Sequence, residues 1–357
     1  MNTFGQKLRA TIFGASHGEY VGITIDGYPA GVAIDGSLIR KRLDQRRGMT
    51  AVTSKRREPD EYKIISGLFN GLTTGAPLTV LVSNRDVDSA PYRENYGIAR
   101  PSHADYVYYH KYRGHADYRG GGTASGRMTV VLVILGALCE QLLAGKNIIV
   151  ASRVKELGGV KDGEFDPKEE ALRTLREEAF PAVSSEAREK MLEKIALTAA
   201  GGDSLGGIAE TYALNLPIGL GEPFFDGVES LIARLVFSVP GVKGVEFGAG
   251  FALAGMTGSV ANDEMSYENG RVAYHSNNAG GINGGLSNGA PLVFRTAFRP
   301  TPSISRPQKT VNFIEKTNVT TSVTGRHDTV IAIKGLHAVN ALALYAIAEL
   351  MAREGAF

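Results

Sequence analysis

The chain has 357 residues, 43% of them hydrophobic, and a formal net charge of +2, so it can bury a large core and has no overall charge that would require nucleic acid or a membrane as its partner. Its single cysteine, Cys139, excludes an intramolecular disulfide framework and is typical of a reducing compartment. The N-terminus has no signal-peptide pattern, and the longest apolar run, residues 128–143, is shorter than the ~20 residues that span a bilayer, so we expect a cytoplasmic protein.

The first residues predict two strands, an exposed turn and a helix. Residues 8–13 form a short apolar strand that ends in the turn G-A-S-H-G, whose glycines predict that Ser16 and His17 are exposed. A histidine at the end of a strand is more often structural, so this motif alone leaves its role open. Alternating apolar residues over 21–25 predict the next strand, and a helix follows at about 37–47.

Basic side chains gather between residues 40 and 57. They are Arg40, Lys41, Arg42, Arg46, Arg47, Lys55, Arg56 and Arg57. This patch suits a ligand with phosphate and carboxylate groups, but a solvated face or an RNA-binding surface is also compatible with it. The aromatic residues that would stack on bases are absent from the patch.

A repeat links the two halves of the chain. Residues 67–78 (G-L-F-N-G-L-T-T-G-A-P-L) match residues 281–292 (G-I-N-G-G-L-S-N-G-A-P-L) at a constant offset of 214, and each copy leads into an apolar strand. We hypothesise that both halves use one strand–turn–strand unit, related by an approximate internal two-fold. Two copies with so long a period cannot form a solenoid.

The most informative stretch is 100–127, R-P-S-H-A-D-Y-V-Y-Y-H-K-Y-R-G-H-A-D-Y-R-G-G-G-T-A-S-G-R. Gly120–Gly122 can bring backbone N–H groups close to an anion, and a helix beginning at about 125–128 adds the positive end of its dipole. Arginines bind phosphate or carboxylate, and histidines transfer protons near neutral pH. The stretch therefore predicts a site for a phosphorylated small molecule, although a solvated basic loop fits it equally well in isolation.

The remaining chain predicts ordinary strands and helices. Residues 128–144 are apolar on nearly every side and predict a helix buried between layers. Long loops rich in glycine, asparagine and serine between 238 and 326 are typical of a site lining. The other expected elements are strands at 80–82, 148–153, 208–216, 293–294 and 330–333, and helices at 166–180, 184–199, 228–237 and 337–352.

Nine segments stand out in order: G-A-S-H-G-E-Y-V-G-I-T-I-D-G-Y-P-A-G, R-R-E-P-D, S-G-L-F-N-G-L-T-T-G-A-P-L, R-P-S-H-A-D-Y, D-Y-R-G-G-G, V-K-G-V-E, N-A-G-G-I-N-G-G, R-P-T-P-S and G-R-H-D. In this order and spacing they resemble the chorismate synthase family from about Phe4 to about Ala352. The resemblance implies an α+β fold, a β-α-β sandwich with helices between two antiparallel sheets, as one domain over residues 1–357. It also implies a homotetramer.

The activity implied by the resemblance is the last step of the shikimate pathway, in which 5-enolpyruvylshikimate 3-phosphate loses phosphate and a C6 hydrogen by anti-1,4-elimination to give chorismate. Family members require reduced FMN, although the reaction has no net redox change. Some fungal members reduce their own flavin with NADPH. No extra domain is present here, so we expect a separate flavin reductase to supply the reduced FMN, and we expect neither nucleic acid, membrane nor metal to take part.

The resemblance also implies roles for individual residues. His17 should act as an acid near the phosphate or flavin, His103 should protonate the flavin or donate to the substrate, and Asp328 should help the flavin take the C6 proton. Substrate contacts are implied for Arg40, Arg46, Arg100 and Arg127. Cofactor contacts are implied for Ser16, Thr123, Ala124, Ser125, Asn278, Ala279, Gly284, Arg299, Pro300, Thr301, Pro302, Ser303 and Arg326.

Some positions depart from the family pattern. The usual R-S-S-A-R-E-T is T-A-S-G-R-M-T here, so Thr123 replaces an arginine and Met128 a glutamate. Ala51 replaces another arginine, and the proline of R-R-P-G is missing after Arg47. Two cations of the phosphate site are thereby lost.

The segment K-Y-R-G-H-A-D is one residue longer than the family's K-Y-G-x-R-D. We hypothesise that Arg113 in this loop substitutes for a lost cation, with Arg119 and Arg42 as alternatives. Three other interpretations stay open: a metal enzyme using the H-A-D triplets at 103–105 and 115–117, a basic RNA-binding protein, and a family member that binds flavin but turns over slowly.

Overall fold

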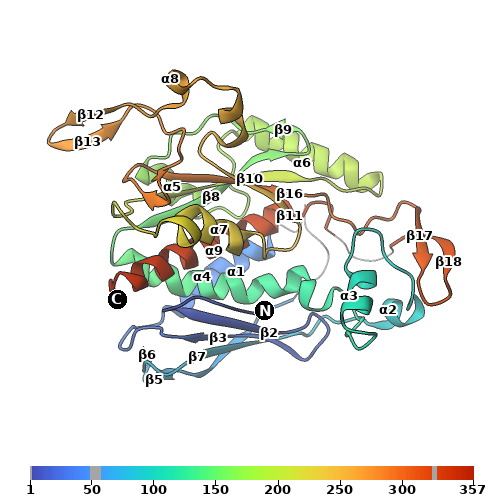
Figure 1. Cartoon of the computed structure of the whole chain (residues 1–357). Helices are drawn as coiled ribbons and strands as arrows, with labels where there is room; N and C mark the ends of the chain where they lie inside the picture. Colours follow the sequence, from blue (N-terminus) through green and yellow to red (C-terminus); the bar gives the residue numbers. More distant parts are fainter. Residues whose placement is uncertain (1, 49–57, 324–327) are drawn as a thin grey trace.

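The computed structural model describes residues 2–48, 58–323 and 328–357. Two five-stranded antiparallel sheets enclose a layer of helices (Figure 1). The first sheet has the order β1 (Thr3–Phe4), β2 (Arg9–Gly14), β3 (Tyr20–Asp26), β7 (Leu78–Ser83), β4 (Tyr62–Ser66). The second has the order β11 (Val242–Phe247), β16 (Leu292–Phe298), β10 (Gly207–Leu214), β8 (Ile149–Leu157), β9 (Val160–Lys161). The expected β-α-β sandwich is confirmed.

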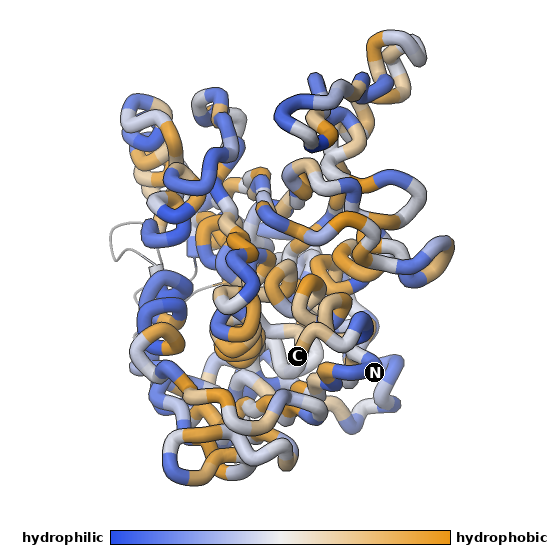
Figure 2. Tube along the Cα trace, turned by 90° about the vertical axis from the view of Figure 1, so that its left-hand side faces the viewer, coloured by the Kyte–Doolittle hydropathy of each residue, from blue (hydrophilic) through white to orange (hydrophobic). Residues whose placement is uncertain are grey.

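The enclosed layer consists of α1 (Gly36–Arg47), α4 (Thr129–Ala144), α7 (Val228–Val236) and α9 (Ala332–Arg353). Helices α4 and α9 pack so closely that a Cβ on Gly136 would lie 2.4 Å from the Cα of Ala341. Segments Gly126–Ala144 and Ala332–Arg353 have the length and hydropathy of membrane spans, but 89% and 83% of them are buried inside the molecule. They are core helices, and Figure 2 shows their apolar stretches in the middle of the chain trace.

The internal duplication is confirmed by the backbone. Hairpin β5 (Leu68–Phe69)–β6 (Leu72–Thr73) and hairpin β14 (Ile282–Asn283)–β15 (Leu286–Ser287) pair in the same register at the offset of 214. Four strands of each sheet also correspond in order, β4-β7-β3-β2 matching β11-β16-β10-β8, whereas the edge strands differ because β1 precedes β2 in the chain and β9 follows β8. Both copies use left-handed φ angles at the same four positions: Gly67, Asn70, Gly71 and Gly75, and Gly281, Gly284, Gly285 and Gly289.

A hydroxyl group fixes each hairpin to a neighbouring loop, the one that follows β3 or the one that follows β10. Thr73 Oγ1 donates to the Pro29 carbonyl and accepts from the Val32 amide. Ser287 Oγ does the same with Pro217 and Leu220. The repeated G-L-x-x-G-L-[ST] pattern is therefore one structural unit used twice.

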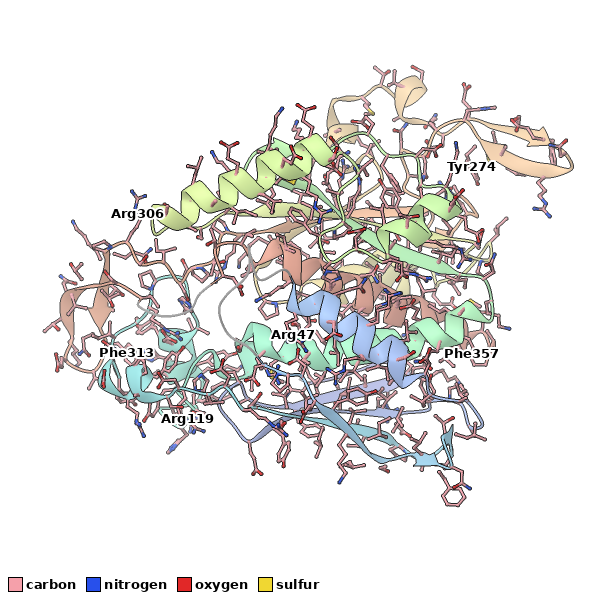
Figure 3. All side chains as sticks on the ribbon, turned by 180° about the vertical axis from the view of Figure 1, so that it is seen from behind. Arg47, Arg119, Tyr274, Arg306, Phe313 and Phe357 are labelled. Carbon is pink, nitrogen blue, oxygen red and sulfur yellow. The ribbon has the colours of Figure 1, made fainter. Side chains whose placement is uncertain are left out.

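Two long connections leave equivalent strands and meet at one end of the molecule. The first runs from β7 to α4 and contains α2 (Ala90–Glu94) and α3 (Asp105–Lys111); the second runs from β16 to α9 and contains β17 (Gln308–Asn312) and β18 (Thr317–Thr321). The amide of Phe313 donates to Gly97 O at 2.8 Å, which joins the connections. Figure 3 shows Phe313 and Arg119 at this end, opposite Tyr274.

Tyr274 lies on a hairpin that extends from the second sheet, formed by β12 (Met265–Glu268) and β13 (Arg271–Tyr274). The remaining helices are α5 (Glu169–Leu175), α6 (Ser185–Ala200) and α8 (Gly258–Ala261). Short 3₁₀ helices occupy Gly122–Ala124, Gly126–Met128, Phe224–Asp226 and Gly250–Gly255.

Most expected elements are present, but the strand at 330–333 is wrong. Val330 forms only an isolated bridge with Leu205, and helix α9 begins at Ala332 rather than 337. A short apolar run has no periodicity that separates a strand from a buried helix, and here it continues directly into a long apolar helix. The helix expected over 166–180 is confined to α5.

Candidate active site

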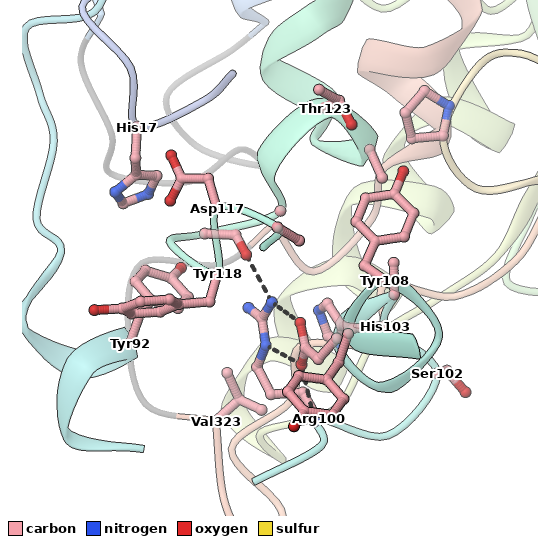
Figure 4. A pocket seen from close by; sticks show the side chains of 18 of the residues that line it. His17, Tyr92, Arg100, Ser102, His103, Tyr108, Asp117, Tyr118, Thr123 and Val323 are labelled. Carbon is pink, nitrogen blue, oxygen red and sulfur yellow. Dashed lines mark hydrogen bonds and ion pairs between the residues drawn. The ribbon is translucent and has the colours of Figure 1, made fainter. Parts of the chain in front are cut away.

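A cavity of about 920 Å³ lies where the two long connections meet (Figure 4). Its volume is near the upper end of the range for small-molecule sites. The structure brings six of the expected site residues into its lining: His17, Arg100, His103, Thr123, Ala124 and Arg299. These residues come from segments far apart in the chain, so the fold, rather than one local motif, assembles the cavity.

The G-A-S-H-G turn places His17 at the cavity wall. Asn84 holds the turn, because its Nδ2 donates to the carbonyls of Ala15 at 3.1 Å and Gly18 at 2.8 Å. The Ser16 amide donates to Gly122 O at 3.2 Å, which joins the turn to the triple glycine. The imidazole Nδ1 of His17 lies 2.9 Å from Ser89 Oγ.

His103 is neutral and has a defined tautomer. Its Nδ1 is 3.1 Å from Pro101 O, and a carbonyl can only accept, so Nδ1 carries the proton. Its Nε2 therefore accepts from Ser303 Oγ, 2.9 Å away. Burial lowers the pKa of His103 to about 4, and the Arg100 guanidinium acts in the same direction.

Arg100 fixes the floor of the cavity. Its guanidinium donates to both carboxylate oxygens of Asp105, at 2.8 and 2.6 Å, and to Gly120 O at 2.8 Å. It also lies 5.1 Å from the ring centre of Tyr92. Two of the three guanidinium nitrogens therefore donate to protein acceptors. Arg100 thus holds neighbouring segments of the cavity wall together and also places a positive charge there.

Arg127 lies beside the cavity in a buried ion cluster. Its guanidinium pairs with Asp60 and donates to Asn84 Oδ1 at 2.8 Å and to Ser83 O at 3.0 Å. Burial lowers the pKa of Arg46, while Asp60 and Asp328 oppose this effect. Asn84 thus joins Arg127 to the turn that carries His17.

The Nε atoms of Arg46 and of the adjacent Arg47 are both buried and have no hydrogen-bond acceptor within the described part of the chain. Arg40, by contrast, donates to the carbonyls of Pro59 and Asp60 at 3.0 and 3.2 Å. Asp328 forms an ion pair with Lys334 at 2.8 Å. Arg326 and Ala51 lie outside the described residues.

Five expected cofactor residues do not line the cavity themselves but follow lining residues in the chain, Ser125 after Ala124 and residues 300–303 after Arg299. Ser125 accepts from the Arg127 amide at 3.2 Å, and Ser303 contacts His103 as described above. Thr301 and Pro300 pack under this loop, where the Ser204 hydroxyl donates to Thr301 O at 2.6 Å. Pro302 lies in the same segment.

Asn278, Ala279 and Gly284 lie away from the cavity. The amides of Asn278 and Ala279 donate to Asp263 at 2.6 and 2.8 Å, at the base of the β12–β13 hairpin. Gly284 forms the turn of β14–β15, which precedes β16, whereas the cavity lies beyond the far end of that strand.

The sequence interpretation missed several lining residues. Pro240–Lys243 line the cavity between α7 and β11, and V-K-G-V-E was recognised there as a family motif without a role. Met128, Leu132, Phe237 and Val242 give the cavity an apolar wall. Tyr92 and Tyr108 also line it without a predicted role, and so does Asp117, which the sequence singled out only in an H-A-D triplet and in the segment D-Y-R-G-G-G.

The structure separates the three candidates for the missing cation. Arg42 is buried and committed to Glu140, at 2.8 and 2.7 Å. Arg113 is exposed in a turn and is not part of the cavity lining. Arg119 pairs with Asp117, which does line the cavity.

The metal interpretation has little support in the H-A-D triplets. Asp105 is bound to Arg100, and Asp117 accepts two hydrogen bonds from Arg119 at 2.8 Å each. Within residues 2–48, 58–323 and 328–357 there is no group of three or more histidine, cysteine or carboxylate side chains that could hold a metal ion.

Comparison with known proteins gives a consistent result. The family model described as chorismate synthase matches residues 8–352. The chorismate synthase of Thermococcus gammatolerans is 44% identical over 354 residues, which cover 99% of this chain and 98% of the relative. That of Dehalococcoides mccartyi is 42% identical, with 99% and 97% covered. A crystal structure of a chorismate synthase matches with a TM-score of 0.76 at 27% identity, covering 98% of this chain and 93% of the other.

Proposed function

The chain belongs to the chorismate synthase family, whose members are carbon–oxygen lyases acting on a phosphate (EC 4.2.3.5), and on this basis we propose that it converts 5-enolpyruvylshikimate 3-phosphate into chorismate. The reaction is an anti-1,4-elimination of phosphate and the C6 hydrogen, the last step of the shikimate pathway, and it requires reduced FMN. The observation that carries the proposal is the meeting of His17, His103 and Arg100 in one large cavity.

The cavity residues fit a reduced flavin. Arg299 lines the cavity, and its Nε is buried without a hydrogen-bond partner within the described residues, which suits a polar ligand. The Oγ of Ser16 and the Oγ1 of Thr301 are likewise buried without such a partner, although neither residue lines the cavity. The apolar wall formed by Met128 and Leu132 suits a ring system. Reduced FMN held beside Thr123, Ala124 and Arg299 would supply transient electron donation to the allylic system of the substrate.

We assign the leaving-group acid to His17, because it lines the cavity from a turn that is only partly exposed, with Ser16 buried rather than exposed as the sequence predicted. Protonating a departing phosphate lowers the charge that develops on it. His103 is neutral in the free protein, and its Nε2 is an acceptor, so it must gain a proton before it can donate one. A bound dianion close to it would favour that protonation.

We propose that Asp328 helps the flavin to take the C6 proton. We assign the binding of the substrate's phosphate and carboxylate groups to Arg46, Arg100, Arg127 and Arg40. Arg46 is the strongest of these assignments because its buried Nε is without an acceptor in the described residues. Arg127 and Arg40 also contact Asp60, so besides their proposed part in binding they would hold the 58–60 segment in place.

The assembly that accompanies this function is also a proposal. We expect one chorismate synthase domain over 1–357, a cytoplasmic homotetramer, and a separate flavin reductase rather than an intrinsic NADPH-dependent activity. Gly284, Asn278 and Ala279 would then serve the cofactor only if a neighbouring subunit brings them to a cavity. We expect no role for nucleic acid or a membrane.

An anaerobic assay tests the function. Purified protein is mixed with FMN, dithionite and 5-enolpyruvylshikimate 3-phosphate, and chorismate absorbance and phosphate release are followed. Equal amounts of both products, absent when the flavin is left oxidised, would support the proposal. Flavin binding without turnover would favour a family member disabled at Thr123 and Ala51, and the absence of both would refute the proposed activity.

A further inference from the structure

The imidazole of His17 is enclosed by groups from two other segments, residues 89–92 and the segment at Gly120. A Cβ on Gly120 would lie 2.4 Å from His17 Cδ2 and 2.5 Å from Nε2, so one edge of the ring lies directly against the Gly120 backbone. Ser89 contacts Nδ1, and the ring of Tyr92 meets the imidazole edge-on at 5.1 Å. The ring therefore has little freedom to rotate.

Asp117 is the carboxylate that faces this ring. Figure 4 shows its side chain pointing toward His17. The Asp117 carboxylate is itself fixed by Arg119, which donates from Nε and NH2 at 2.8 Å each and from its backbone amide at 3.1 Å. The Arg119 hydrogen bonds lower the pKa of Asp117, and the charge of His17 acts in the same direction, so the carboxylate is ionised at neutral pH.

Neither Asp117 nor Ser89 is explained by local structure alone. A partly exposed ion pair between residues two apart contributes little to stability, typically about 0–1 kcal/mol. Ser89 occupies the N-cap position of α2, where a serine usually accepts from a helix amide, but its side chain makes no capping hydrogen bond. Its hydroxyl is instead directed to His17.

We propose that Asp117, held by Arg119, is a positioning residue that keeps the His17 imidazole protonated and fixed at the cavity wall while Ser89 accepts from its Nδ1–H. This inference rests on the proposed role of His17 as the acid of the elimination. Asp117 is not expected to touch the reacting atoms.

Other charged groups near His17 provide the matched control. Asp86, Asp88 and Tyr92 line the same cavity from the β7–α2 connection, and Arg100 lies behind Tyr92. The Asp88 carboxylate accepts from the Ala90 amide at 3.1 Å. Asp88→Asn removes the same charge from the same cavity without removing the carboxylate that faces the imidazole.

The test is a titration of His17 by NMR in histidine-labelled full-length protein, with His17→Gln identifying its signal. Asp117→Asn should lower the midpoint of the His17 titration by about one pH unit, since an opposite charge at close range favours the protonated imidazole. Asp88→Asn should lower it by less than half as much. Asp117→Glu, which keeps the charge, should restore most of the wild-type value.

Kinetics supply a second readout. An acid must be protonated, so the alkaline limb of kcat should move to lower pH in Asp117→Asn by the same amount, with the KM for substrate unchanged. The proposal is overturned if the His17 midpoint does not move, or if Asp88→Asn lowers it equally. A wild-type protein without turnover would count against the proposed function, while the NMR titration would still decide the role of Asp117.

Discussion

Gly120→Ala is the substitution that tests the geometry of His17 most sharply. Gly120 has φ +62°, and an alanine Cβ there would lie 2.4 Å from His17 Cδ2 and 2.9 Å from Ser16 Oγ. Carbon atoms in contact are normally separated by about 3.5 Å, so the imidazole must retreat by about 1 Å. The left-handed backbone adds about 1–2 kcal/mol of strain for a residue with a side chain.

A displacement of about 1 Å in a catalytic group can reduce the rate about 100-fold, which corresponds to about 2.7 kcal/mol in the activation barrier. We therefore expect kcat to fall by about two orders of magnitude, and the free energy of unfolding to fall by about 1–2 kcal/mol. Anaerobic turnover with reduced FMN gives the first quantity, and urea denaturation gives the second.

Gly159→Ala is the matched control, because Gly159 has φ +87° and a Cβ there would meet no atom within 4 Å. It carries the backbone strain without the collision, so it should lose similar stability and keep its kcat. If Gly120→Ala keeps a kcat within two-fold of wild type, the assigned packing of His17 is wrong. If Gly159→Ala loses kcat equally, the loss is a general consequence of instability.

Three further predictions concern buried ionisable groups. Glu349→Gln should lower the free energy of unfolding, measured by urea denaturation, by about 2–4 kcal/mol. Glu349 is fully buried and accepts hydrogen bonds from the amides of Gln6, Lys7 and Leu8. Glu354→Gln, at an exposed position, should change the free energy of unfolding little. Asp60→Asn should lower the free energy of unfolding by about 3–5 kcal/mol, because it leaves Arg127 buried without its counter-charge. Asparagine tolerates the left-handed φ of 51° at this position, so backbone strain does not add to the loss. A loss no larger than that of Asp166→Asn, in the exposed ion pair with Lys168, would contradict this prediction. Burial lowers the pKa of His337 to about 4, below its usual value near 6.5, so the unfolded chain binds the extra proton first and stability should be lost as pH falls from 6.5 to 4. In His337→Gln the decline of the urea midpoint over that window should be shallower, and an unchanged decline would refute this assignment.

The sequence was sufficient for most of the fold, because the patterns that define it are local. The alternation in β3 and the apolar length of α4 follow from periodicity, and the 214-residue repeat predicted a shared hairpin whose φ angles agree position by position. The one wrong strand, at 330–333, lies where a short apolar run has no period to distinguish it.

The site was predicted in part. Motifs identified His17, His103 and Arg100, which do share a cavity. The motifs could not show that Arg127 forms an ion pair with Asp60, because the two residues are 67 positions apart in the sequence and Asp60 has a left-handed backbone conformation. Pro240–Lys243 were missed and Asn278 and Ala279 were chosen, since only the packing of α7 against β11 determines which loop faces the cavity.

The departures from the family pattern at Thr123 and Met128 also show what the sequence could and could not predict about the site. Both residues line the cavity, so the altered R-S-S-A-R-E-T segment does border the proposed site. Arg113, the favoured substitute, does not line it. Arg119 forms an ion pair with Asp117, which lines the cavity, and no sequence pattern predicts this contact.

The most direct measurement is single-turnover formation of chorismate with reduced FMN, comparing wild type with His17→Asn under anaerobic conditions. We predict that phosphate and chorismate appear together in the wild type, and that His17→Asn slows both about 100-fold or more while its Kd for FMN stays within a few-fold of wild type. Equal rates in the two proteins would contradict the assignment of the chemistry to this cavity. A wild type that forms no chorismate would contradict the proposed function itself.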